Sequence, residues 1–188
     1  MTEVAEKFNQ EVTDYLKSGV SLVHVFYQGN EGEVIDIIKN SMPNKSGNQR
    51  TARTYGYYEW DKDNGLMCMD AKSEEMFGLE KTSDINWVFK FFLSPKTPWN
   101  KRHDFDCWVV VLKGTEYLED TTAIRWIKEI DIHNDDENNL IRKQIHMLHK
   151  ISDGKDFEKE KIVKMQNIPI EIRETSLIID MQLSNSKV

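Results

Sequence analysis

The chain has 188 residues, of which 30% are charged and 39% hydrophobic, a composition typical of a folded globular domain rather than a disordered or fibrous protein. Lys and Arg number 25 against 32 Asp and Glu, a net charge of −7 that disfavours binding to a nucleic-acid backbone. Cys68 and Cys107 are too few for a disulfide framework or a four-cysteine zinc site. No apolar run is long enough to cross a bilayer. We therefore expect a cytoplasmic chain with reduced thiols, one α/β domain over residues 1–188, and neither a membrane partner nor a cofactor.

The first predicted elements follow one another as in an α/β protein. Residues 2–17 carry apolar side chains at three- and four-residue spacing and end before Gly19, which predicts an amphipathic helix. Residues 20–27 are apolar almost throughout, as in a strand that is buried on both faces of a parallel sheet. A turn at 28–30 leads into a helix that begins at Glu31. Together these elements form the first half of a β-α-β unit.

The middle of the chain is less regular. The sequence predicts a polar loop at 43–53, a second strand at 54–60 and a turn at 61–65. Residues 66–83 have no clear pattern, and residues 85–93 fit a helix or a strand.

The strongest strand signal is the apolar run at 106–114, which we expect at the centre of the sheet. A helix is predicted over 117–130, a strand over 141–151, a solvated charge run over 155–161 and a last strand over 176–183. This alternation of strands and helices predicts a three-layer α/β sandwich around a mainly parallel sheet of about five strands.

Ligands of such sheets bind beyond the carboxyl ends of the strands, so the turn after Tyr27 is the first candidate site. A phosphate-binding loop needs several glycines, followed by Lys and Ser or Thr at the start of the helix. The segment Gln28–Glu33 has no Lys and places two carboxylates at the helix N-terminus. Because a phosphate would meet like charge there, we expect no nucleotide at this loop.

Three carboxylates near predicted strand ends leave open a metal-dependent hydrolase or nuclease as an alternative. Asp61 and Asp63 lie in the turn after the second strand, and Glu116 follows the central strand. An Asx turn is the simpler interpretation of the two aspartates, and the start of a helix is the simpler role for Glu116. His146 and His149 are three residues apart in a predicted strand, so they should point to opposite faces and share no metal. We assign no metal ligands and no catalytic residues.

Aromatic side chains crowd residues 55–108, where most should belong to the core. Trp99 follows two prolines in a basic loop, and an exposed Trp beside Lys101 and Arg102 is typical of a protein-binding anchor. Trp60 is a further candidate for this partner-binding surface. A small viral or mobile-element effector that binds a host protein through this loop is a second alternative function.

Several short motifs over residues 16–183 follow one another in the same order as in a known protein family. Their order along the chain is Leu22–Val25, Asn30–Val34, Tyr58–Trp60, Gly65–Leu66, Val110–Gly114, Tyr117–Leu118, Ala123–Arg125, Ile168–Ile172 and Ile178–Asp180. In this order the chain resembles the N-terminal half of a group of AAA+ ATPases of plastids, cyanobacteria and other bacteria. Glu33 stands where that family has an arginine, and Gly114 stands where it has an acid.

The resemblance implies a degenerate AAA+-like, P-loop-type fold without a phosphate loop. In that family an active ATPase module follows this region. The present chain would then be either a stand-alone relative or the N-terminal domain of a longer protein, and ATPase activity would require such a module beyond Val188. The function that the resemblance implies for this chain is non-catalytic: assembly by self-association, or recognition of a protein partner.

Overall fold

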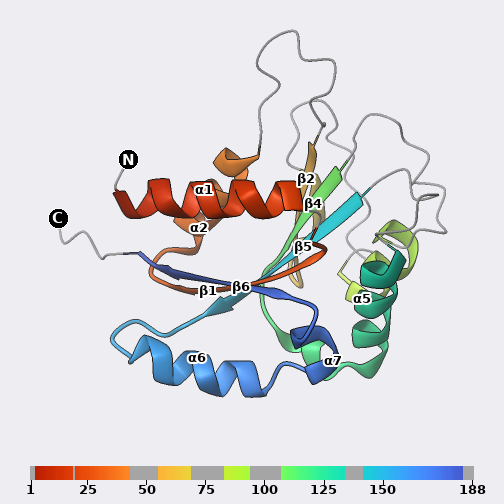
Figure 1. Ribbon diagram of the computed structural model, residues 1–188. Helices are drawn as coiled ribbons and strands as arrows, with labels where there is room; N and C mark the ends of the chain where they lie inside the picture. The colour runs from red at the N-terminus through yellow and green to blue at the C-terminus, as the bar shows by residue number, and fades with distance from the viewer. Residues whose placement is uncertain are drawn as a thin grey trace, which may run out of the picture.

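The computed structural model describes residues 3–18, 20–42, 55–68, 83–93, 107–133 and 142–183. Six strands form one sheet in the order β3-β2-β4-β5-β1-β6 (Figure 1). The strands are β1 (Leu22–Gln28), β2 (Tyr55–Asp61), β3 (Gly65–Cys68), β4 (Cys107–Leu112), β5 (Arg142–Lys150) and β6 (Leu177–Gln182). Neighbouring strands are parallel except β2 and β3, which form an antiparallel hairpin. The predicted α/β class and mainly parallel sheet are therefore confirmed, and β3 adds an edge strand from a segment whose sequence pattern was unclear.

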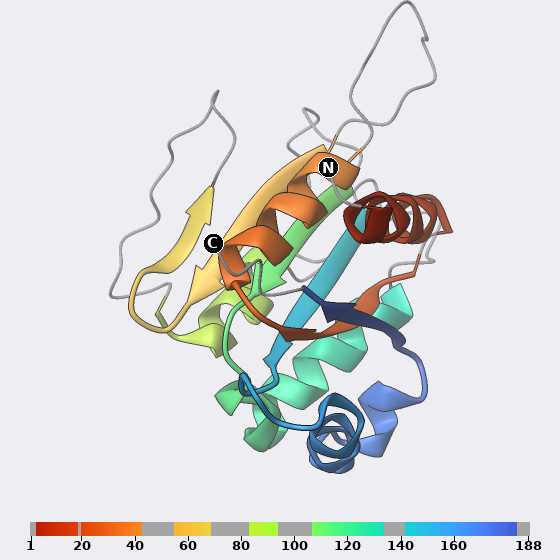
Figure 2. The same ribbon diagram turned by 90° about the vertical axis from the view of Figure 1, so that its left-hand side faces the viewer.

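Helices cover both faces of the sheet. On one face lie α1 (Glu3–Ser18) and α2 (Glu31–Ser41), and on the other lie α5 (Thr121–His133), α6 (Phe157–Gln166) and α7 (Ile170–Arg173), as both ribbon views show (Figures 1 and 2). Three short helical segments complete the described elements: α4 (Ile85–Trp87), the π-helix η1 (Val88–Leu93) and the 3₁₀-helix η3 (Glu116–Glu119). None of the helices in the described ranges combines the length and the hydrophobicity that a membrane span requires.

Each face of the sheet has its own hydrophobic core, because successive strand side chains point to opposite sides. On β1, Leu22 and Phe26 belong to the core beneath α5, α6 and α7. Val23 and Val25 belong to the core beneath α1 and α2. The prediction that this strand is buried on both faces is confirmed.

Two segments differ from expectation. The predicted charge run at 155–161 contains the first turn of α6, where Asp156 accepts a hydrogen bond from the Lys159 N–H and Phe157 is buried. The charges concealed this helix because one buried aromatic residue at its start is enough to anchor it. Residues 85–93, which fitted either element, are helical.

Candidate functional site

The turn between β1 and α2 supplies its own hydrogen-bond partners and its own negative charge. The Asn30 side chain accepts a hydrogen bond from the Gly32 N–H at 2.8 Å, and the Tyr27 hydroxyl donates to Glu31 at 2.6 Å. Glu31 and Glu33 both lie in the first turn of α2, where carboxylates complement the helix dipole. A phosphate at this position would compete with Asn30 and would approach two carboxylates.

The same turn is also closed by its neighbours. Gly29 has a φ of +114°, and a Cβ added there would lie 3.1 Å from the Leu183 Cβ at the end of β6. The Leu183 N–H donates to the Gln28 carbonyl at 3.1 Å. The Gln28 side chain in turn donates to the carbonyls of Ser152 and Lys155. The turn after β1 is thus tied to the segments that follow β5 and β6.

A buried ion-pair cluster lies on the α2 side of the sheet. Glu59 on β2 is 4% exposed, and its two carboxylate oxygens accept from Lys39 at 3.1 Å and from Lys113 at 2.7 Å. Burial alone would raise the pKa of Glu59, but hydrogen bonds from Lys113 and Lys39 outweigh burial and hold this pKa below its ordinary value. The sequence signal was a carboxylate alternating with aromatic residues in a strand, which indicates a buried charge in need of partners.

The three acidic candidates do not form a common site. Asp61 accepts hydrogen bonds from the backbone N–H groups of Asp63 and Asn64 at 2.9 and 2.7 Å, which is an Asx turn. Glu116 instead begins η3 and packs against Gly114. Across the ranges that the structure describes, no three His, Cys, Asp or Glu side chains gather so that they could hold a metal. The metal-dependent alternative has no support from these residues.

Of the four candidates for a partner-binding surface, the structure describes only Trp60. Trp60 is 4% exposed, and its ring packs edge-on against Tyr117 in the core beneath α5. Its inclusion in a partner-binding surface was therefore wrong, because both faces of β2 are buried and Trp60 faces the core beneath α5. Trp99, Lys101 and Arg102 lie outside the described residues.

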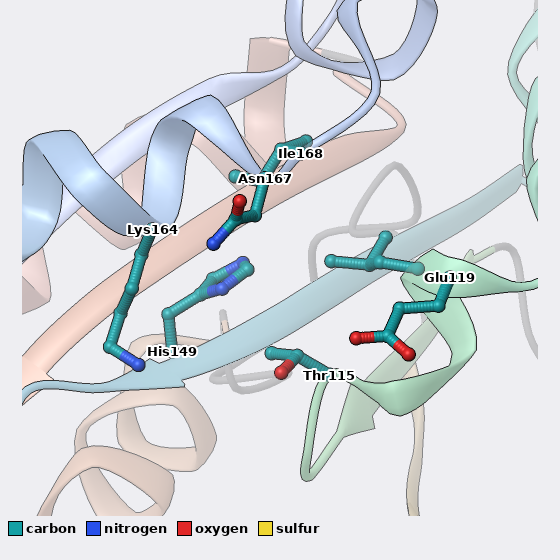
Figure 3. A pocket seen from close by; sticks show the side chains of 7 residues that line it. Thr115, Glu119, His149, Lys164, Asn167 and Ile168 are labelled. Carbon is teal, nitrogen blue, oxygen red and sulfur yellow. The ribbon is translucent and has the colours of Figure 1, made fainter.

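A cavity of about 400 Å³ opens beyond the carboxyl ends of β4 and β5 (Figure 3). Its wall is formed by η3, the end of β5 and the end of α6, with the lining residues Thr115, Leu118, Glu119, His149, Lys164, Asn167 and Ile168. This is the edge of the sheet at which ligands of α/β proteins bind. The sequence pattern points to the turn after β1 and not to this neighbouring position, because the cavity residues come from three distant segments.

Two buried histidines belong to this region: His149 lines the cavity, and His24 contacts His149. His24 Nδ1 and His149 Nε2 are 2.8 Å apart, and Phe26 stacks on the His149 ring with centroids 4.6 Å apart. Burial lowers the pKa of His24 to about 4 and that of His149 to about 3. Both rings are therefore neutral at physiological pH. His146 lies on the opposite face of β5, as predicted, and pairs with Gln144 at 2.8 Å.

The exposed large apolar side chains of the described residues all belong to one helical layer. They are Ile132 at the end of α5, Ile162 and Val163 on α6, and Ile170 on α7, each more than half exposed. We name Ile162, Val163 and Ile170 the α6–α7 apolar patch. Ile162 and Val163 are consecutive on α6, and Ile170 belongs to the next helix along the chain. Exposed apolar side chains that cluster are characteristic of interaction surfaces.

Comparison of the chain with protein-family models, with curated proteins and with solved structures found no match. Its function must therefore be inferred from its own residues. Two features on the α5–α7 face suggest a function: the α6–α7 apolar patch and the cavity beyond β4 and β5, which we call the strand-end cavity. The turn between β1 and α2, where a phosphate loop would lie, is acidic and closed.

Proposed function

We propose that this chain is a non-catalytic α/β domain for assembly or protein-partner recognition, of the degenerate AAA+-like type that its motifs resemble. The observation that carries the proposal is the α6–α7 apolar patch. On α6, Phe157 faces the core whereas Ile162 and Val163 are 54% and 58% exposed. The helix thus has apolar groups on its core side and on its outer side, as expected of a helix that is covered twice.

The surroundings of the patch fit a protein interface. Glu158 and Lys159 are exposed on the same helix, and the Lys159 side chain is 84% exposed. An apolar centre with a polar, charged rim is the usual anatomy of an interface. Covering Ile162 and Val163 would remove apolar area from water, which favours association by about 25 cal/mol per Å².

The turn between β1 and α2 is a second, independent support. A nucleotide-type sheet commonly uses this turn to hold phosphate, but here Glu31, Asn30 and Leu183 occupy it. A domain that retains the sheet without this phosphate position is suited to contact rather than to hydrolysis.

The test compares three versions of the full chain: wild type, Ile162→Ser/Val163→Ser, and Glu158→Ser as a matched control on the same helix. Sedimentation velocity measures self-association, and quantitative co-purification from the source cells measures other partners. The proposal expects an association that the double variant loses and the control keeps. An association equally strong in all three chains would contradict it.

The effector alternative makes a different prediction, because it uses the Trp99 loop. If Trp99→Ala removes the partner while Ile162→Ser/Val163→Ser retains it, the effector alternative replaces the proposal.

A further inference from the structure

The strand-end cavity contains two opposite charges that do not neutralise each other. Lys164 projects from α6 on one side and Glu119 from η3 on the other (Figure 3). Neither side chain forms an ion pair with another described residue. Glu119 is exposed and Lys164 is partly exposed, so water solvates both charges in the free protein, and a ligand that carries both signs could replace this water at both of them.

The Lys164 wall is rich in hydrogen-bond donors. Figure 3 shows Lys164 and Asn167 lying beside His149, so an ammonium and an amide share this wall. Thr115 adds a hydroxyl to the cavity lining. Convergent donors of this kind suit a carboxylate.

The contact between His24 and His149 determines which nitrogen of His149 carries the proton at the cavity. His24 Nε2 is buried without a hydrogen-bond partner among the described residues. Because a buried N–H without a partner is rarer and more costly than a lone pair without one, we assign the proton of His24 to Nδ1, which donates to His149 Nε2. The proton of neutral His149 then resides on its own Nδ1. His149 is thus a donor that stays uncharged, which leaves Lys164 as the cation of this wall.

The volume and the charges of the cavity limit the class of ligand further. A cavity of about 400 Å³ lies at the small end of ligand sites, which span roughly 300–1,000 Å³. One lysine opposed by Glu119 is a poor match for the several negative charges of a nucleotide. Leu118 and Ile168 line the cavity as well, and they can contact a short aliphatic segment.

From these observations we propose that the strand-end cavity binds a small amino-acid zwitterion, with Lys164 and Asn167 on its carboxylate and Glu119 on its ammonium group. This is a binding site separate from the α6–α7 apolar patch, and it requires no chemistry on the ligand.

The experiment uses three matched series at millimolar concentration: glycine, β-alanine and γ-aminobutyrate as zwitterions; acetate, propionate and butyrate as anions; and methylamine, ethylamine and propylamine as cations. Thermal shift of the full chain screens them, and titration calorimetry measures the affinity of any hit. We expect at least one zwitterion to raise the melting temperature in a saturable way, while its matched anion and amine, such as acetate and methylamine for glycine, do not.

Variants then locate the site. Lys164→Met and Glu119→Gln should each weaken the zwitterion by at least about tenfold, since each removes one charge-assisted contact. Lys159→Met, on the exposed side of the same helix, should leave its affinity unchanged, and so should Ile162→Ser/Val163→Ser. Retention of affinity in the latter separates this proposal from the proposed function.

Three results would overturn the inference. The first is that no member of the zwitterion series shifts the melting temperature. The second is that an anion binds as tightly as its matched zwitterion and that Glu119→Gln weakens the binding of neither compound. The third is that Lys164→Met and Glu119→Gln both leave the affinity for the zwitterion unchanged.

Discussion

The two faces of the sheet differ in the side chains and cavities that they present to solvent. On the α1–α2 face, Glu59 is buried between two lysines, and the turn after β1 caps and closes itself. On the α5–α7 face, His24 keeps a buried nitrogen without a described partner, a cavity holds two unpaired charges, and apolar side chains are exposed. Both faces bury polar atoms without a described partner, such as His146 Nδ1 on the α1–α2 face and His24 Nε2 on the other. Among the described residues, the faces differ in that the exposed large apolar side chains and the strand-end cavity both lie on the α5–α7 side, which is where we would expect another molecule to bind.

The largest expected effect is the response of stability to acid, to which both faces contribute. His24, His146 and His149 are buried, and burial lowers each pKa to about 4, 4 and 3 respectively. Below pH 6.5, which is about the pKa of a histidine in the unfolded chain, the three histidines bind protons in the unfolded chain but not in the native chain. The free energy of unfolding should therefore be highest above this pH and fall as the pH drops towards 4, by up to about 4 kcal/mol per pH unit for three histidines.

Urea unfolding at a series of pH values checks this dependence and apportions it between the faces. His146→Gln, on the α1–α2 side, should remove about a third of the slope, and His24→Leu/His149→Leu about two thirds. A free energy of unfolding that stays constant from neutral pH to about pH 5 would contradict the burial of neutral histidines.

A second effect tests the ion pairs of Glu59 on the α1–α2 face. Lys39→Met/Lys113→Met leaves the Glu59 carboxylate buried without partners and should cost about 3–5 kcal/mol of unfolding free energy. Glu59→Gln should cost less, because the two lysine side chains are 31% and 21% exposed and can be hydrated. Equal losses from these variants in chemical denaturation would show that the lysines do not stabilise Glu59 as an ion.

A third effect compares two glycines of positive φ. Gly29 meets Leu183 where a Cβ would lie, whereas Gly154, with a φ of +78°, has open space there. Each change to Ala carries a backbone strain of about 1–2 kcal/mol. Gly29→Ala should cost about 1 kcal/mol more than Gly154→Ala, because only Gly29 adds a steric contact. Identical melting temperatures for the two variants would argue against the closed turn.

The smallest expected effect concerns the α6–α7 apolar patch. Ile162→Ser/Val163→Ser should change the free energy of unfolding of the isolated chain by no more than about 0.5 kcal/mol, because both side chains are exposed. Phe157→Ala on the same helix removes a buried ring and should cost about 3–5 kcal/mol. A large loss from the double serine variant would mean that the patch supports the fold rather than a partner.

Much of the fold could be predicted from the sequence, because strands buried on both faces carry continuous apolar runs. The patterns at 20–27 and 106–114 gave β1 and β4 within two residues. The start of α6 was missed, since its charged residues mask a helix that is anchored by Phe157. Trp60 was misplaced because aromatic composition alone does not reveal that both faces of β2 are covered.

The candidate site was harder to predict than the fold. The acidic, self-capped turn after β1 follows from local sequence, so its character could be anticipated. The cavity could not, because it brings together Glu119, His149 and Lys164 from three segments whose spatial order depends on β5 lying between β4 and β1. The His24–His149 pair likewise arises from the register of β1 and β5.

If the chain acts by binding a partner, as we propose, it should not bind nucleotides, because Asn30, Glu31 and Leu183 close the turn where a phosphate would bind. The most direct measurement is the melting temperature of the full chain with and without millimolar Mg-ATP or Mg-ADP. The expected result is an unchanged melting temperature with either nucleotide. A saturable rise of the melting temperature, equivalent to about 2.7 kcal/mol of stabilisation at a hundredfold excess of nucleotide over the dissociation constant, would contradict the account and show that the chain binds nucleotides.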